Sequence, residues 1–523
     1  MSRWLKVALT FAVLTAAFPA LAEDAGDLCH AHGIVREVAS ACGRGEWAPT
    51  QMAQASPLEA HTQPLAEGRS PFSKDASRIS NISFGAPPQD ASGPPHRPNI
   101  VFIMADDLGY ECIGANGGTS YQTPVIDSLA RTGMRFEHCY AQPLCTPSRV
   151  KLMTGMSNAR NYEKFGVLDR AQTTFAHLLK DAGYATCIAG KWQLGSEKDA
   201  AQHFGFERSC LWHHTRDGRS MKDGKKYDRR YVNPQLEFNG EEKEFANGEY
   251  GPQICADFIC DFIEQNKAEP FLVYYPMILT HCPFDPTPDS SDWKSKRLGS
   301  TTYKGDQKDY QRHFGDMLRY ADRLVGQIVS QLERSGVADN TLILFTGDNG
   351  TDQPIISKCN GIDVAGGKGK MTDAGTRVPL IANWPGVIAS GKVSHDLVDF
   401  SDFLPTLCEA AKTEPPANLV IDGHSFLPLL QGENYQPRAW IYCWYSRDGK
   451  NNIQEWARTQ RYKLYRGGKL YDISQDRLEE APLADLTLEA KQARSRLQQA
   501  LDQFKEVRPA RDAPGNRRKP ARK

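Results

Sequence analysis

Two pairs of polar side chains could do chemistry together. Asp106 and Asp107 directly follow one apolar run, and Asp348 and Asn349 directly follow another. Three carboxylates and an amide are hard oxygen donors of the kind that calcium prefers, with magnesium a less expected ion, and the carboxylates would repel one another without a cation. Single aspartates at such positions are usually caps or turn formers, but two pairs after apolar runs favour a metal site.

A cysteine lies in the sequence QPLCTPSRVKLMTG, residues 142–155, at the start of a segment able to form a helix. A helix N-terminus stabilises anions and Arg149 adds a fixed positive charge, so Cys145 is in a position that favours a reactive thiol. Pro147 suits the first helical turn. The short pattern C-x-P-x-R also fits a structural cysteine buried in the core, and the pattern alone does not separate the two interpretations.

The composition is that of an ordinary globular enzyme. The 523 residues include 63 basic and 63 acidic side chains, so the formal net charge is zero and nucleic acid is not an expected partner. The length allows two domains. Of 13 cysteines, setting Cys145 aside leaves 12, an even number compatible with disulfide pairing. The absence of a C-x-x-C pair argues against a zinc site.

The two ends of the chain differ from its middle. Residues 1–22 have a basic start, an apolar run and an Ala-Leu-Ala cleavage site, so we expect a signal peptide cut after Ala22 and a secreted or periplasmic protein. The apolar run is shorter than the ~20 residues of a membrane span, so no span is expected after signal removal. Residues 23–97 are interpreted as a linker or disordered arm and residues 508–523 as a basic disordered tail.

Strands and helices alternate from residue 98 onward. Continuous apolar runs predict strands buried on both faces, and apolar stripes with a 3.6-residue period predict helices between them. Thr123 and Thr173 are the expected helix N-caps, and Gly133 is expected to end the first of these helices. The predicted strands are residues 99–104, 185–189, 271–277 and 341–345, and the longer predicted helices are residues 254–263 and 310–332.

This alternation predicts an α/β fold with a large mixed, mostly parallel sheet sandwiched by helices. Sheets of this kind place their sites at the carboxyl ends of strands, where both acidic pairs lie. Residues 208–250 are polar and predict an irregular surface loop. Short strands and a helix at 488–504 predict a smaller C-terminal domain with an antiparallel sheet. We therefore expect a catalytic domain over 98–424 and a small α+β domain over 425–507.

Several spaced motifs occur in one order: NIVFIMADDLGY, CTPSRVKLMTG, GKWQLG, THCPF, FTGDNG and GGKGKMTDAGTRVP. Together they make residues 98–505 resemble the type I sulfatase family, which is arylsulfatase-like and belongs to the alkaline phosphatase superfamily. The segment KLYDISQDRLEEAPLADL resembles that family's small terminal domain. In this family the cysteine of C-x-P-S-R is oxidised after translation to formylglycine. The resemblance therefore implies a maturation partner, a formylglycine-generating enzyme or an anaerobic sulfatase-maturating enzyme.

The resemblance implies that Asp106, Asp107, Asp348 and Asn349 hold one calcium ion together with the modified Cys145. The hydrated aldehyde, a gem-diol, supplies the nucleophile: one hydroxyl attacks sulfur and the alcohol or phenol departs. The other hydroxyl then loses its proton, the C–O bond breaks, sulfate leaves and the aldehyde is regenerated. Metal and cations stabilise charge on the sulfate oxygens, which is mainly electrostatic catalysis.

Four more motif residues receive roles from the resemblance. Arg149 would steady the formylglycine, and Lys191 would hydrogen-bond to it. His281 and Lys368 would bind the sulfate and assist the leaving oxygen. Taken singly, these side chains also fit structural or surface positions, but as a set beside the metal donors they favour a catalytic site.

Gln193 is a departure from the family, whose motif here is G-K-W-H-L-G. The family's histidine hydrogen-bonds the formylglycine and is assigned the deprotonation that expels sulfate. A glutamine amide donates and accepts hydrogen bonds but takes no proton near neutral pH. Either another group does that work, elimination is slow, or the preferred substrate differs.

Three functions remain open from the sequence. The first is a sulfuric ester hydrolase acting on a sulfated small molecule or sulfated glycan, that is, a carbohydrate or aryl sulfate. The second is a phosphonate monoester or phosphodiester hydrolase of the same superfamily. The third is a turnover-impaired protein that binds sulfated glycans, because of Gln193. Residues 208–250, 285–305 and 353–365 are expected to choose the substrate, but they carry no recognisable sugar-binding signature.

Overall fold

The computed structural model describes residues 97–213, 219–222, 225–294 and 307–508. The predicted signal peptide lies outside the described residues, as do the predicted arm and tail except for Arg97 and Arg508. No helix in the described part of the chain combines the length and the apolar character that crossing a membrane requires.

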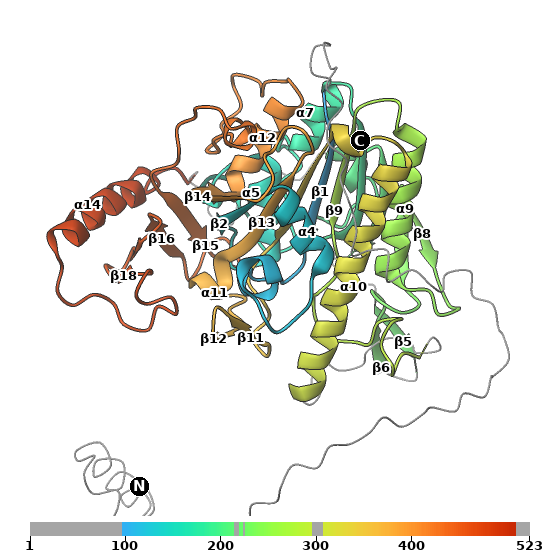
Figure 1. Ribbon diagram of the computed structural model, residues 1–523, viewed down its shortest axis with the longest axis horizontal. Coiled ribbons are helices and arrows are strands. Elements are labelled where there is room, and N and C mark those ends of the chain that lie inside the picture. The colour runs from blue at the N-terminus through green and yellow to red at the C-terminus, as the bar shows by residue number, and fades with distance from the viewer. Residues whose placement is uncertain (1–96, 214–218, 223–224, 295–306, 509–523) are drawn as a thin grey trace, which may run out of the picture. The chain divides into compact units, whose positions relative to one another are not determined.

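A sheet of ten strands organises the main part of the chain (Figure 1). Its strands are β1 (Asn99–Ala105), β2 (Met134–Tyr140), β3 (Ala185–Trp192), β4 (Arg208–His213), β7 (Gln235–Phe238), β8 (Glu241–Glu244), β9 (Phe271–Pro276), β10 (Thr341–Gly347), β13 (Arg377–Asn383) and β14 (Lys392–Asp399). They are ordered β14-β2-β13-β10-β1-β9-β3-β4-β7-β8. All neighbours from β10 to β4 pair in parallel, and antiparallel pairs flank them. The predicted α/β fold with a mixed, mostly parallel sheet is confirmed.

Helices cover both faces of this sheet, and side chains along β1 accordingly alternate between two buried clusters. Phe102 and Met104 join one cluster with residues of α5, α7 and α12, whereas Val101 and Ile103 join the other with residues of α4, α9 and α10. The larger helices are α4 (Pro124–Thr132), α5 (Cys145–Thr154), α7 (Phe175–Asp181), α9 (Gly251–Asn266), α10 (Gln307–Arg334) and α12 (Phe403–Ala410). Shorter ones are η3 (Tyr110–Cys112), η4 (Gly114–Asn116), α6 (Asn158–Asn161), α8 (Ala200–His203), η5 (Ala338–Asn340), α11 (Asp373–Thr376), η6 (Phe400–Asp402) and α13 (Leu427–Gln431).

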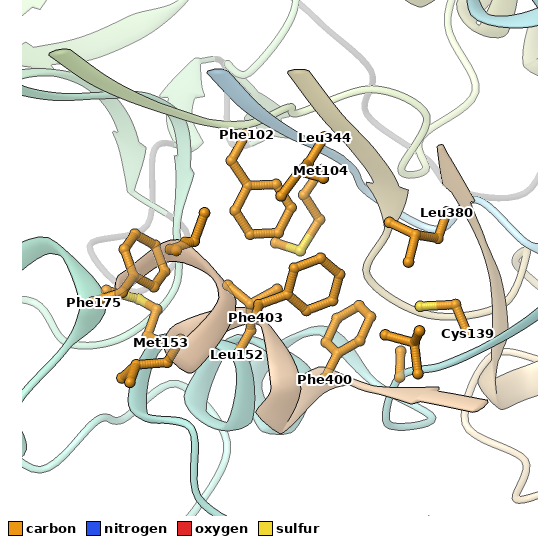
Figure 2. Close-up of a cluster of buried hydrophobic side chains, with 14 of the residues drawn as sticks. Phe102, Met104, Cys139, Leu152, Met153, Phe175, Leu344, Leu380, Phe400 and Phe403 are labelled. Atoms are coloured by element: carbon orange, nitrogen blue, oxygen red, sulfur yellow. The ribbon is translucent and has the colours of Figure 1, made fainter. Parts of the chain in front are cut away.

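A group of aromatic and aliphatic side chains holds α5 against the sheet (Figure 2). The ring of Phe102 on β1 stacks on that of Phe403 at a centroid distance of 4.9 Å, and Phe400 meets Phe403 edge to face at 5.4 Å. Leu152 and Met153 of α5 are fully buried in the same cluster. This packing fixes the height of α5 over the sheet, and with it the position of the residue that begins the helix.

The prediction of an irregular surface loop over residues 208–250 is wrong. Strands β4, β7 and β8 in this segment extend the main sheet, and β5 (Arg219–Lys222) pairs with β6 (Lys225–Asp228). Every residue of β8 is exposed, so an edge strand of this kind has no apolar alternation in the sequence. Arg230 in the same segment is only 1% exposed. The described residues of this segment therefore lie largely in strands, and some of them, such as Arg230, are buried in the fold.

The last described part forms a smaller antiparallel sheet with a helix, as predicted. Strands β15 (Ile441–Tyr445), β16 (Gln454–Arg458), β17 (Tyr462–Tyr465) and β18 (Leu470–Asp472) pair in sequence order, and α14 (Leu488–Gln503) follows. A separate two-stranded hairpin, β11 (Ile356–Cys359) and β12 (Ile362–Ala365), occupies the segment at 353–365. The division into domains at residue 424 stays a prediction.

Two local expectations need correction. The N-cap of α7 is Thr174 and not Thr173, because the Thr174 side chain accepts the backbone N–H of His177 in a capping box. The cysteine count suggested pairing, yet the eleven cysteines in the described residues are all free. Cys29 and Cys42 lie outside those residues.

Replacing Phe102 by alanine should lower the free energy of unfolding by about 3–5 kcal/mol, because the lost ring leaves a cavity beside Phe403. Chemical denaturation followed by tryptophan fluorescence measures the change. Val420→Ala is the control, because Val420 is 51% exposed, and it should change stability by less than about 0.5 kcal/mol. A loss below about 1 kcal/mol for Phe102→Ala would contradict the packing described.

Candidate active site

The two acidic pairs meet at the carboxyl ends of neighbouring strands. Parallel pairing of β1 with β10 sets Ala105 opposite Gly347, so Asp107 and Asp348 follow at the same edge of the sheet. The backbone N–H of Asp107 donates to Asp348 Oδ1 at 3.0 Å, and Asn349 Nδ2 donates to Asp107 Oδ1 at 2.8 Å. The predicted convergence of these side chains is therefore present in the structure.

Cys145 is the first residue of α5 and is 1% exposed. Its Sγ and one carboxylate oxygen each of Asp106 and Asp348 all lie within 4.8 Å of one another. Burial raises the pKa of the Cys145 thiol, and the attraction of Lys191 does not offset it. The helix start therefore does not make this cysteine a thiolate nucleophile, although the thiol lies among the carboxylates.

Two buried cations pair with two of the carboxylates. Lys191 Nζ on β3 lies 2.6 Å from Asp106 Oδ2, and Arg149 of α5 donates to Asp348 Oδ2 from Nε at 3.2 Å and from Nη2 at 2.9 Å. Arg149 Nη1 also donates to the backbone oxygen of Lys191 at 3.0 Å. These contacts tie the start of α5 to the end of β3.

A third cation, Lys368, joins Asp107 to His281. Lys368 Nζ donates to Asp107 Oδ2 and lies 3.0 Å from His281 Nε2. Burial opposes the charge on Lys368, but Asp107 outweighs it and holds the lysine pKa well above its ordinary value. Each of three carboxylates thus has a cation beside it, and Lys368 Nζ also lies 3.8 Å from Asp352 Oδ2.

Two opposing effects set the pKa values of the three carboxyl groups: burial raises them and the neighbouring cations lower them. Burial disfavours ionisation of Asp106, but Lys191 and Arg149 outweigh it, so its pKa lies below the ordinary value. Burial raises the pKa of Asp107 to about 6 against the pull of Lys368. Burial and the neighbouring charge of Asp106 raise the pKa of Asp348 to about 7.

Two oxygens in this cluster have no hydrogen-bond partner in the described residues. They are Asp106 Oδ1 and Asn349 Oδ1, and both are buried. A buried polar atom without a partner is costly, and contact with an ion or an ordered water would remove that cost. With Asp107 and Asp348, these oxygens form the hard donor set that suits a cation such as calcium.

His281 is held in the neutral state. Burial and the nearby cations Lys368, Lys191 and Arg230 put its pKa well below the ordinary value. Nδ1 lies against the backbone oxygen of Cys282, and Nε2 faces the Lys368 ammonium.

Arg230 is a residue of this site that sequence reasoning missed. Its Nη1 lies 2.8 Å from His281 Nδ1 and donates to the Cys282 backbone oxygen at 2.8 Å. The guanidinium is held by both carboxylate oxygens of Asp228 and stacks over the Trp212 ring at 4.3 Å. One arginine in a basic, polar stretch has no sequence signature that distinguishes it, because its burial depends on how that stretch folds around His281.

Gln193 follows β3 directly and is 1% exposed. Both polar atoms of its amide, Nε2 and Oε1, are buried without a hydrogen-bond partner among the described residues. The other predicted site residues form one connected cluster, but within the described chain no side-chain hydrogen bond joins Gln193 to that cluster. Its amide is therefore free to bind something that the resting chain does not provide.

Backbone packing fixes the loop that carries Lys368. Lys368 N donates to the Thr351 backbone oxygen at 3.0 Å, and Gly369 N donates to that of Pro143 at 2.7 Å. A Cβ at Gly366 would lie 2.0 Å from the Asp352 backbone oxygen, so only glycine allows this close approach. The glycine-rich stretch therefore holds Lys368 beside the turn before Cys145.

Comparison with known proteins gives a consistent picture. The sulfatase family model matches residues 98–413, and the model for the C-terminal part of N-sulphoglucosamine sulphohydrolase matches residues 367–507. N-acetylgalactosamine-6-sulfatase of Mus musculus is 33% identical over 66% of this chain and 68% of its own length. Arylsulfatase A of Homo sapiens is 31% identical over 70% of this chain and 74% of its own.

Solved structures show the same fold. The crystal structure of Ps i-CgsB in complex with k-i-k-neocarrahexaose aligns with a TM-score of 0.65 and 23% identity, and the alignment covers 79% of this chain and 93% of the other. At this identity the likeness concerns the fold alone. The family model spans the sheet, both acidic pairs and the cysteine helix. The chain therefore belongs to the type I sulfatase family, as its motifs predict, and is a sulfatase.

Proposed function

We propose that this chain hydrolyses a sulfate ester of a carbohydrate or aryl alcohol, using a formylglycine made from Cys145 and one calcium ion. The observation that carries the proposal is the convergence of Cys145 with buried carboxylates at one sheet edge, where its sulfur and oxygens of Asp106 and Asp348 lie within 4.8 Å of one another. Curated relatives named N-acetylgalactosamine-6-sulfatase and arylsulfatase A support the substrate class.

The donor set fits calcium. Asp106, Asp107, Asp348 and Asn349 would hold the ion, and it would satisfy the two buried oxygens that lack partners in the described chain. When bound, calcium supplies positive charge to the sulfate oxygens as negative charge builds on them. Because cations already lie beside the three carboxylates, a divalent ion would make the site more positive, which suits an anionic ester.

Formylglycine at position 145 would supply the attacking hydroxyl in its hydrated form. The buried, neutral thiol of Cys145 is poorly suited to attack, which supports a role for this residue after oxidation. Arg149 and Lys191 would steady the modified side chain, because they fix the start of α5 against the end of β3. Side-chain order there limits the geometries that an attacking oxygen can adopt.

Lys368 and His281 would bind the sulfate and assist the leaving oxygen. Lys368 keeps its proton, because its pKa is raised, and offers hydrogen bonds from an ammonium. His281 is neutral, and its Nδ1 lies against Arg230 and the Cys282 backbone oxygen. The attack half of the reaction therefore has a nucleophile position, an ion site and donors for the leaving group, whereas the release half has Gln193 in place of a base.

Protein produced with a maturating enzyme should carry an aldehyde at position 145 and release nitrophenol from 4-nitrophenyl sulfate. Cys145→Ala should lower kcat by about 10³-fold or more, because the attacking group is gone. Mass spectrometry of the peptide that contains residue 145 reads the modification. Active protein with only a thiol there would refute the mechanism, and faster hydrolysis of a phosphonate monoester of the same phenol would favour the phosphonate alternative.

Calcium should bind the apo protein more tightly as pH rises from 5 to 8, because protons on Asp107 and Asp348, with pKa values of about 6 and 7, compete with the ion. Raised carboxyl pKa values also mean that apo stability falls as pH rises through this range, so calcium should stabilise most above pH 7. Calorimetry in two buffers of different ionisation enthalpy measures affinity and proton release. Asp348→Asn should weaken binding and flatten its pH dependence; a pH-independent affinity in the unchanged protein would contradict the assignment.

Gln193→His should raise turnover if expulsion of sulfate limits the cycle, because an imidazole can take the proton that an amide cannot. Single-turnover release of the phenol and steady-state kcat are measured together. The expected result is an unchanged first turnover and a kcat raised by about tenfold. Gln193→Asn, which keeps the amide, is the control and should not raise kcat. Unchanged rates in both regimes would sink the idea that Gln193 limits release.

A further inference from the structure

A pocket of about 590 Å³ lies between the small C-terminal sheet and the segment after α6. We call it the β15–β16 pocket. It is lined by Lys164, Phe165, Gly369, Tyr445, Arg447 and residues of the turn 448–454. Its size falls in the range of ligand sites.

Backbone contacts tie the walls of this pocket to the catalytic cluster. Gly369 directly follows Lys368, and its N–H donates to the Pro143 oxygen at 2.7 Å, just before Cys145. On the other side of Cys145, Thr146 Oγ1 accepts the N–H of Gly166 at 3.1 Å. Two lining residues therefore connect the β15–β16 pocket to the catalytic cluster. Gly369 follows Lys368 in the chain, and Phe165 precedes Gly166, which contacts the residue after Cys145.

The pocket carries two cations whose charge is not met by a carboxylate. Within the described part of the chain, neither Lys164 nor Arg447 forms an ion pair, and both are exposed. The Arg447 guanidinium lies over the Phe165 ring at 5.0 Å, and the backbone oxygen of Arg447 accepts the Phe165 N–H at 3.0 Å. A guanidinium stacked in this way keeps its N–H groups available for a planar anion.

The one acidic residue among those that line the pocket is engaged in its own turn. Asp448 Oδ1 accepts the backbone N–H groups of Lys450 at 2.9 Å and Asn451 at 2.8 Å, and Oδ2 accepts Asn451 Nδ2 at 2.6 Å. These bonds satisfy the carboxylate without Arg447 or Lys164. The pocket is therefore net positive, with amide side chains from the same turn beside it.

We propose that the β15–β16 pocket binds the leaving-group part of the substrate and selects an ester whose neighbouring ring bears a second anionic group, a carboxylate or a further sulfate. The proposal rests on the proposed sulfatase function and specifies its substrate as an acidic oligosaccharide. Arg447 and Lys164 recognise the second anion, and neither takes part in the bond that breaks. Amide groups of the turn suit sugar hydroxyls.

The test measures binding to the full-length matured protein by calorimetry and turnover of 4-nitrophenyl sulfate, whose leaving group has no second anion. The probes are a chondroitin 6-sulfate disaccharide, its carboxyl-reduced form, and a disulfated disaccharide without a carboxylate. Arg447→Gln and Lys164→Gln should each weaken binding of the acidic probes by about tenfold. Both should leave kcat/KM for 4-nitrophenyl sulfate within about twofold.

Arg131→Gln is the matched control, because Arg131 is an exposed arginine on α4 whose side chain contacts Ser128. It should change no affinity. Tighter binding of the uronate probe than of its reduced form identifies a carboxylate as the second anion, and tighter binding of the disulfated probe identifies a sulfate. If neither acidic probe binds more tightly than the reduced one, or Arg447→Gln has no effect, the proposal is wrong. If the unchanged protein does not hydrolyse 4-nitrophenyl sulfate, the proposed function is wrong. Calorimetry would still show whether the β15–β16 pocket binds the acidic probes.

Discussion

The parallel register of β1 with β10 brings three buried carboxylates together, those of Asp106, Asp107 and Asp348. Ionised carboxylates buried without compensation are strongly destabilising, so at this register they need either cations beside them or bound protons. Arg149 lies beside Asp348, Lys191 beside Asp106 and Lys368 beside Asp107. These cations come from a helix, a neighbouring strand and a distant loop, so the charge requirement at one sheet edge links three separate parts of the chain.

The small C-terminal sheet takes part in meeting this requirement. Asp373 lies shortly after Lys368 and is held by Arg458 at 2.7 Å and by Lys463 at 3.2 Å. Lys463 also reaches Glu479 at 2.7 Å, and all four side chains of this network are buried. Removing one member would leave a buried charge unpaired, so the network fixes the loop that presents Lys368. The terminal sheet therefore holds the loop of Lys368 through Asp373, and it also forms one wall of the β15–β16 pocket.

Four central strands, β1, β3, β9 and β10, could be predicted from their apolar runs. The interior strand β13, although almost wholly buried, and the outer strands could not. β1 and β10 are apolar runs because they are buried on both faces, whereas β2 is mixed in burial and β8 is wholly exposed. The site residues came from motifs that resemble a known family, and their convergence follows from the order of the strands. Arg230 could not be predicted, because its contact with His281 depends on the folding of a polar segment that has no periodic signal.

Gln193 differs in kind from the rest of the site. The charged side chains there have partners in the resting chain, but both polar atoms of this amide are buried without one among the described residues. Such burial costs about 1–3 kcal/mol per polar group, and an ordered water or a group that enters the site can offset it. An amide can then donate and accept hydrogen bonds as an imidazole would, so binding and orientation are preserved. In the mechanism proposed above, the difference from histidine is confined to proton acceptance, so we expect the consequence of this residue in the release of sulfate and not in the attack on the ester.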